Sequence, residues 1–73
     1  MAKAISVIRR DVSKAKSALI KKALKRGLYE NFGQKEIRKL QDKYGYIPEV
    51  ERLDDWAMNF DMSQLQRERA KRR

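Results

Sequence analysis

The stretch MAKAISVIRRDVSKAKSALIKKALKR, residues 1–26, decides how this chain folds. Apolar side chains recur in it at steps of three and four residues, which keeps them on one side of an α-helix. This apolar seam comprises Ile5, Ile8, Val12, Ala15 and Leu19. No Pro or Gly interrupts the stretch before Gly27, and glycine commonly ends helices. The pattern predicts one long helix over about residues 2–26.

The opposite side of this predicted helix carries a basic row, which comprises Lys3, Arg10, Lys14, Lys21 and Lys25. At about 100° per residue these positions fall within roughly 60° of one another. At a rise of about 1.5 Å per residue the row is roughly 33 Å long. Solvated helix faces usually mix charges of both signs, whereas only Asp11 accompanies nine basic residues here. The row therefore favours an anionic partner.

The composition narrows the possible functions. The chain has 73 residues, enough for one small domain, and it contains neither Cys nor His. Disulfides and cysteine metal sites are therefore excluded, and the commonest general base is missing. The longest apolar run is three residues, too short to cross a membrane. We expect a cytoplasmic protein that is not an enzyme and that uses no cofactor or metal.

The net charge of +9 is unevenly distributed. Residues 1–26 carry +8, residues 27–46 carry +1, residues 47–66 carry −4 and residues 67–73 carry +4. A basic helix and a basic tail thus bracket an acidic segment, and a polyanion is the default partner for such a chain. The acidic side chains fit a solvated helix start better than a metal site; they are Glu49, Glu51, Asp54 and Asp55.

After Gly27 the sequence predicts further short helices. Asn31 and Gln34 have the spacing of a capping box, so a second helix is expected over residues 34–44, ended by Gly45. Pro48 suits the first turn of a third helix over about residues 48–60. Residues 62–70 could form a fourth, and residues 67–73 are expected to fray as a basic tail.

The expected fold is therefore all-α, a single domain over residues 1–66 with three helices or four. Most of the core should come from Leu28, Tyr29, Phe32, Ile37, Leu40, Tyr44, Ile47, Val50, Leu53 and Phe60. Two short helices can hardly cover the whole first helix. Its N-terminal half should either project or pair with a second copy through Ile5, Ile8 and Val12, giving a homodimer.

The first functional hypothesis is binding of DNA or RNA through phosphates, with little sequence preference. Its contact residues would be Lys3, Arg10, Lys14, Lys21, Lys25, Arg26, Arg67, Arg69, Lys71, Arg72 and Arg73. A membrane surface ranks lower because the seam is narrow and lacks aromatic residues. An acidic protein surface is a third option. The alternative hypothesis is a protein-contact patch made by Trp56, Met58, Phe60 and Met62.

Part of the chain also resembles known sequences. The run RGLYENFGQKEIRKLQDKY (residues 26–44), with DDWAMN (residues 54–59), resembles small uncharacterised proteins encoded by bacteriophages and mobile elements. The resemblance covers residues 26–59 and leaves out the basic first helix. It implies a phage accessory protein in the cytoplasm of a bacterial host. Such a protein would bind nucleic acid or would bind and modulate a host protein.

Overall fold

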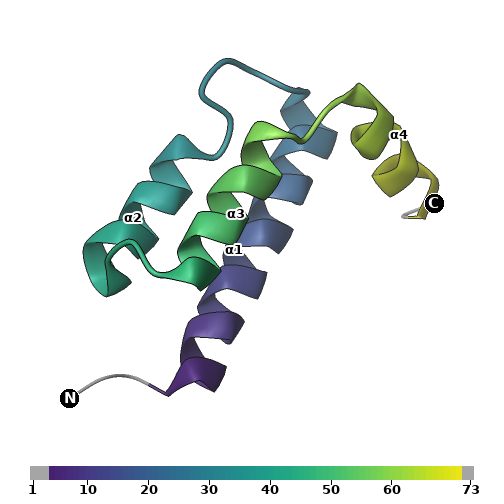
Figure 1. Cartoon of the computed structure of the whole chain (residues 1–73). Helices are drawn as coiled ribbons and strands as arrows, with labels where there is room; N and C mark the ends of the chain where they lie inside the picture. Colours follow the sequence, from purple (N-terminus) through teal and green to yellow (C-terminus); the bar gives the residue numbers. More distant parts are fainter. Residues whose placement is uncertain (1–3, 72–73) are drawn as a thin grey trace.

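The computed structural model describes residues 4–71, and all the regular structure in this part of the chain is helical. The helices are α1 (Ile5–Arg26), α2 (Gln34–Tyr44), α3 (Pro48–Met58) and α4 (Met62–Lys71). The predicted all-α fold is confirmed, and the fourth helix is present. In Figure 1, α2 and α3 lie side by side against the long α1, while α4 turns away and packs near the C-terminal end of α1.

Two apolar clusters hold the helices together. The first joins α2 and α3 to the middle of α1; its buried members are Ile37, Leu40, Val50, Leu53 and Ala57. The second joins α4 to the C-terminal half of α1; its buried members are Ile20, Ala23, Phe60 and Leu65. Phe32 and Trp56 pack against both clusters and so link them. The core is therefore extended along α1, in a molecule that measures 41 × 24 × 16 Å.

Most of the predicted core is buried or partly buried, but Tyr29 is an exception. Its side chain is 44% exposed, so its placement in the core was wrong. The seam of α1 is also covered unevenly. Ile8 and Leu19 are buried, whereas Ile5 is 49% exposed because α2 and α3 reach only part of the way along α1.

The start of α1 differs from the prediction. Ala4 has an extended backbone (φ −61°, ψ 141°), so within the described residues the helix begins at Ile5 rather than near residue 2. The predicted stop is confirmed: Gly27 has a φ of 84°, and its N–H donates to the Ala23 carbonyl at 2.7 Å. Leu28 then packs against the cluster that contains Ala23.

The predicted capping box before α2 was wrong. The residue preceding α2 is Gly33, and no side chain caps the helix. Instead, the Gln34 N–H donates to the Asn31 carbonyl at 3.1 Å, so the backbone itself forms the turn. Gly33 is required at this point. Its φ is +82°, and a Cβ there would lie 3.2 Å from both the Ala57 Cβ and Leu19 Cδ1.

Pro48 occupies the first turn of α3 as predicted, but α3 ends at Met58 rather than near residue 60. The Asn59 side chain donates from Nδ2 to the Asp55 carbonyl at 2.8 Å and satisfies an end carbonyl. Asp61 then caps α4, because its Oδ1 accepts the Gln64 N–H at 3.1 Å.

The chain remains helical from Met62 to Lys71, so the prediction of a fraying tail was wrong for residues 67–71. The helix is held by Leu65, which is 0% exposed.

Candidate nucleic-acid interface

The basic row of α1 is exposed along its described length. Val12 and Ala15 pack toward the core of α2 and α3, so side chains on the other side of α1 point outward. The row residues concerned are Arg10, Lys14, Lys21 and Lys25, all exposed. Lys3 lies outside the described residues. None of the four takes part in the ion pairs found within residues 4–71. They therefore present a row of positive charges outside these ion pairs along about 22 Å of helix.

A second set of cations, which the sequence reasoning missed, lies on α2. Lys35, Lys39 and Lys43 are spaced by four residues and therefore share one side of that helix. All three are exposed. The repeated spacing of four was the signal that could have revealed them.

Two ion pairs attach this side of α2 to α1. The Lys22 ammonium of α1 donates to the Glu36 carboxylate of α2. The Lys43 ammonium of α2 lies 3.0 Å from the Asp11 carboxylate of α1, and the Tyr44 hydroxyl also donates to Asp11. These contacts orient both helices. We call the exposed surface that they border the basic face; it comprises Arg10, Lys14, Lys21, Lys25, Lys35 and Lys39.

Both carboxylates at the boundary between α1 and α2 are ionised at neutral pH. The hydrogen bonds from Tyr44 and Lys43 lower the pKa of Asp11. Burial alone would raise the pKa of Glu36, but the hydrogen bond and the charge of Lys22 outweigh it and lower the pKa. Each acid is already engaged by a cation, Asp11 by Lys43 and Glu36 by Lys22. The charges of Lys14 and Lys39, two residues of the basic face, also help to lower the pKa of Asp11 and of Glu36 respectively, although the ion pairs themselves are made by Lys43 and Lys22.

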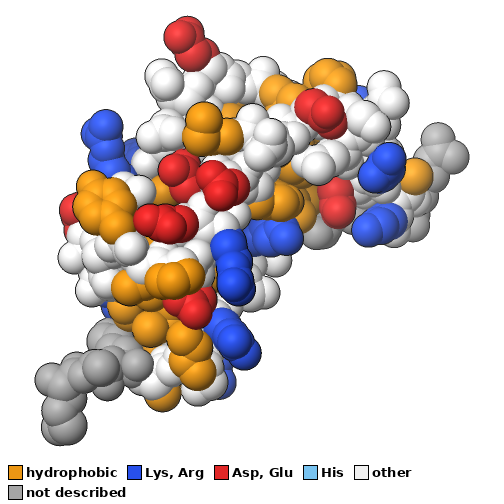
Figure 2. All heavy atoms as spheres, in the orientation of Figure 1, with side chains coloured by type: hydrophobic (Ala, Val, Ile, Leu, Met, Phe, Trp, Pro, Cys, Tyr) orange, Lys and Arg blue, Asp and Glu red, His pale blue; other side chains and the backbone are white. Residues whose placement is uncertain are grey.

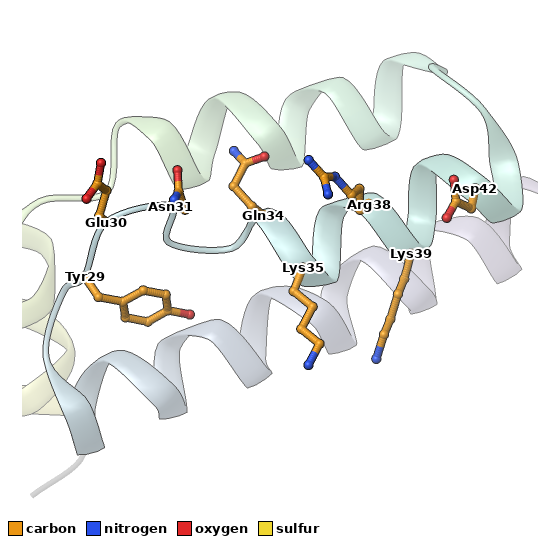
Figure 3. A pocket seen from close by; sticks show the side chains of 8 residues that line it. All are labelled: Tyr29, Glu30, Asn31, Gln34, Lys35, Arg38, Lys39 and Asp42. Atoms are coloured by element: carbon orange, nitrogen blue, oxygen red, sulfur yellow. The ribbon is translucent and has the colours of Figure 1, made fainter.

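The connector between α1 and α2 forms the end of this surface. A hollow of about 450 Å³ lies between the two helices there, lined by Lys22, Arg26, Tyr29, Asn31, Lys35 and Glu36. A second hollow of about 580 Å³ shares Tyr29, Asn31 and Lys35 with it and continues along α2. Figure 3 shows the Tyr29 ring extending from the connector, with the amino ends of Lys35 and Lys39 directed to one side of α2.

Three of the predicted C-terminal cations lie on α4 rather than in a frayed tail. Arg67, Arg69 and Lys71 are exposed residues of α4. Lys71 lies 3.8 Å from Glu68, one turn away on the same helix. Arg67 and Lys71 line a different hollow, together with Lys16 and Trp56. The structure therefore does not bring them into the hollow between α1 and α2. Arg72 and Arg73 lie outside the described residues.

The protein-contact patch of the alternative hypothesis is divided by the fold. The Phe60 ring stacks on Phe32 at 5.3 Å and lies 5.1 Å from the Trp56 ring, so these aromatic residues belong to the core. Met58 is 73% exposed and Met62 is 52% exposed. Of the predicted patch, only the two methionines are exposed, and they lie on either side of the turn between α3 and α4.

The acidic residues gather on α3, away from the basic row. In Figure 2 several acidic side chains appear over the part of the visible face that α2 and α3 occupy, with basic side chains beside them. Glu51 and Asp55 are exposed, whereas Glu49 and Asp54 are half-buried. Within residues 4–71 no three potential ligands are arranged to hold a metal ion. None of the four helices is both long enough and apolar enough to cross a bilayer.

Comparisons with family models, with curated proteins and with solved structures gave no match for this chain.

Proposed function

We propose that this protein binds nucleic acid through the phosphate backbone, using the basic face of α1 and α2. The observation that supports this most directly is the exposed row of α1, in which four cations take no part in the ion pairs found within the described residues. Like charges held close together destabilise a compact fold. Binding a polyanion offsets that repulsion and releases its condensed counterions.

The chemistry of the face favours affinity over sequence recognition. Five of its six residues are lysines, and the sixth is Arg10. A lysine ammonium contacts phosphate as a point charge and has no planar fork with which to read a base edge. We therefore expect weak sequence preference and strong dependence on salt. From the resemblance of residues 26–59 to small phage proteins that the sequence led us to expect, we also propose an accessory role in a bacterial cytoplasm.

The test is fluorescence anisotropy of a labelled DNA duplex and a labelled single-stranded RNA across a salt series. The informative variant is Lys14→Glu with Lys21→Glu, which reverses two charges of the row. The matched control is Arg9→Glu with Arg52→Glu, because these residues line a hollow between α1 and α3 and the net charge changes equally. Circular dichroism confirms that each variant is folded.

The row variant should weaken duplex binding at least about tenfold, and its slope of log affinity against log salt should fall by about 2, since each phosphate contact contributes about 0.9. The control should change both quantities much less. If both variants weaken binding equally, the affinity depends only on the net charge of the protein, and the basic face is not the binding site. No binding by the wild-type protein at low salt would refute the proposal.

A protein-interaction module is the second candidate function, and the exposure of Met58 and Met62 favours it. Methionine is flexible and polarisable, and it suits surfaces that contact other proteins. Under this alternative, Met58→Ser with Met62→Ser should abolish capture of a partner from a bacterial lysate, whereas the lysine reversals should not. Retained capture by the methionine variant would exclude this surface.

A further inference from the structure

An exposed aromatic ring lies at the end of the basic face. The Tyr29 side chain is 44% exposed although its neighbour in the connector, Phe32, is largely covered. The two rings meet edge to face, with centroids 5.6 Å apart and planes inclined at 75°. This contact fixes the tyrosine ring from one side and leaves it accessible from the hollows that it lines.

Cations from two helices line one of the hollows that Tyr29 lines, together with Glu36. Arg26, at the end of α1, and Lys35, in the first turn of α2, line the same hollow as Tyr29. Neither forms an ion pair within the part of the chain that the structure describes. Lys22 lines the hollow as well, but Glu36 engages it. An aromatic ring is thus flanked by two available positive charges.

The connector that holds this ring is conformationally restricted. Asn31 adopts a left-handed backbone (φ 63°), and its carbonyl accepts the Gln34 N–H. Gly33 has a φ of +82°, and a Cβ there would lie only 3.2 Å from Leu19 Cδ1 and from the Ala57 Cβ. A turn fixed in this way positions the ring before any ligand arrives, which lowers the ordering cost of binding.

An aromatic platform flanked by cations matches the chemistry of an unpaired nucleotide. Bases stack on aromatic side chains whatever their identity, and basic residues hold the phosphates on either side. In a duplex the base faces are already stacked on their neighbours and cannot reach the ring. Lys25 of the basic row lies in the last turn of α1, the same turn that carries Arg26.

We propose that the hollow between α1 and α2 binds an unpaired nucleotide, with its base stacked on Tyr29 and its flanking phosphates held by Arg26 and Lys35. The protein would therefore prefer single-stranded nucleic acid. This inference rests on the proposed function, because the basic face supplies the rest of the contacts.

The first test compares a labelled single-stranded oligonucleotide with a duplex of the same length, both measured by anisotropy. Tyr29→Leu should weaken single-strand binding by at least about fivefold and leave duplex binding unchanged, because stacking one base contributes a factor of this size or more. Tyr29→Phe keeps the ring and should bind as the wild type does. Tyr46→Leu is the matched control, since Tyr46 is 76% exposed and lies in the α2–α3 connection.

The second test uses the unmodified protein and so does not depend on how a variant folds. A single strand containing 5-iodouridine is photo-crosslinked to the protein, and the adduct is mapped by mass spectrometry. An adduct on Tyr29 supports the inference. An adduct confined to other residues overturns the inference, and so does a Tyr29→Leu effect that is equal for the single strand and the duplex; both outcomes leave phosphate binding intact. If the protein binds neither the single strand nor the duplex, the proposed function is refuted as well.

Discussion

Leu65 is the buried side chain through which α4 packs against α1. It is the only buried residue of α4, at 0% exposure, and it packs in the cluster with Ile20, Ala23 and Phe60. Replacing it with alanine removes three buried carbon atoms, a transfer cost of about 2.4 kcal/mol at about 0.8 kcal/mol each. A residual cavity raises the expected cost to about 3–5 kcal/mol.

That loss should melt α4 before it unfolds the rest of the molecule. A ten-residue helix is marginal in water by itself, so α4 needs its packing to stay helical. A domain of this size is expected to be stable by roughly 4–11 kcal/mol, and the cluster of α2 and α3 does not involve Leu65. We therefore expect Leu65→Ala to unfold α4, while α1, α2 and α3 stay folded and their backbone amides stay protected from hydrogen exchange.

Amide hydrogen exchange measured by mass spectrometry resolves the two regions. In Leu65→Ala, protection of residues 62–71 should fall to the level of an unfolded peptide, and trypsin should cleave rapidly after Arg67 and Arg69. Met62→Ala is the matched control, because Met62 belongs to the same helix but is 52% exposed. Unchanged protection of α4 in Leu65→Ala would refute the argument that Leu65 holds this helix.

Two further predictions concern the backbone and pH. Gly33→Ala should lower the free energy of unfolding, measured with urea, by about 2–4 kcal/mol. The reason is that alanine would have to adopt a left-handed φ and its Cβ would crowd the Ala57 Cβ. A loss under about 0.5 kcal/mol would contradict this. In the folded state the pKa of Asp11 lies below its ordinary value of 3.8, because Tyr44 and Lys43 donate hydrogen bonds to the carboxylate. The ionised carboxylate therefore stabilises the fold above pH 3.8, and this stabilisation is lost as the pH falls through the lowered pKa. Asp11→Asn should therefore lose less stability than the wild type on acidification, as measured by urea midpoints, and an equal loss would show that the bonds to Tyr44 and Lys43 contribute little.

Local sequence signals predicted the helices because they act within one or two turns. The steps of three and four residues in the seam defined the long first helix, and its end at Gly27 follows from the conformational freedom of glycine. Pro48 likewise suits the start of α3. The capping-box prediction failed because another local interaction competed with it. The side chains of Asn31 and Gln34 fit a capping box, but the backbone bond between these residues formed the turn instead.

The candidate site was only partly predictable. The exposure of the described row residues follows from the period of α1, because residues half a turn from a buried seam must face outward. The contribution of Lys35 and Lys39 does not follow from their own helix. It depends on the pairs Lys22–Glu36 and Lys43–Asp11, which join residues distant in the chain.

The sequence by itself determined the helical class of this protein, the separation of its charges along the chain and the exposure of the described residues of its basic row. All three depend on composition or on helical periodicity, which act locally. Only the tertiary structure decided that Phe60 is buried while Tyr29 is exposed, and that α4 docks through Leu65. Apolar residues of similar size compete for a limited enclosed volume, and the packing of distant helices decides which of them occupy it.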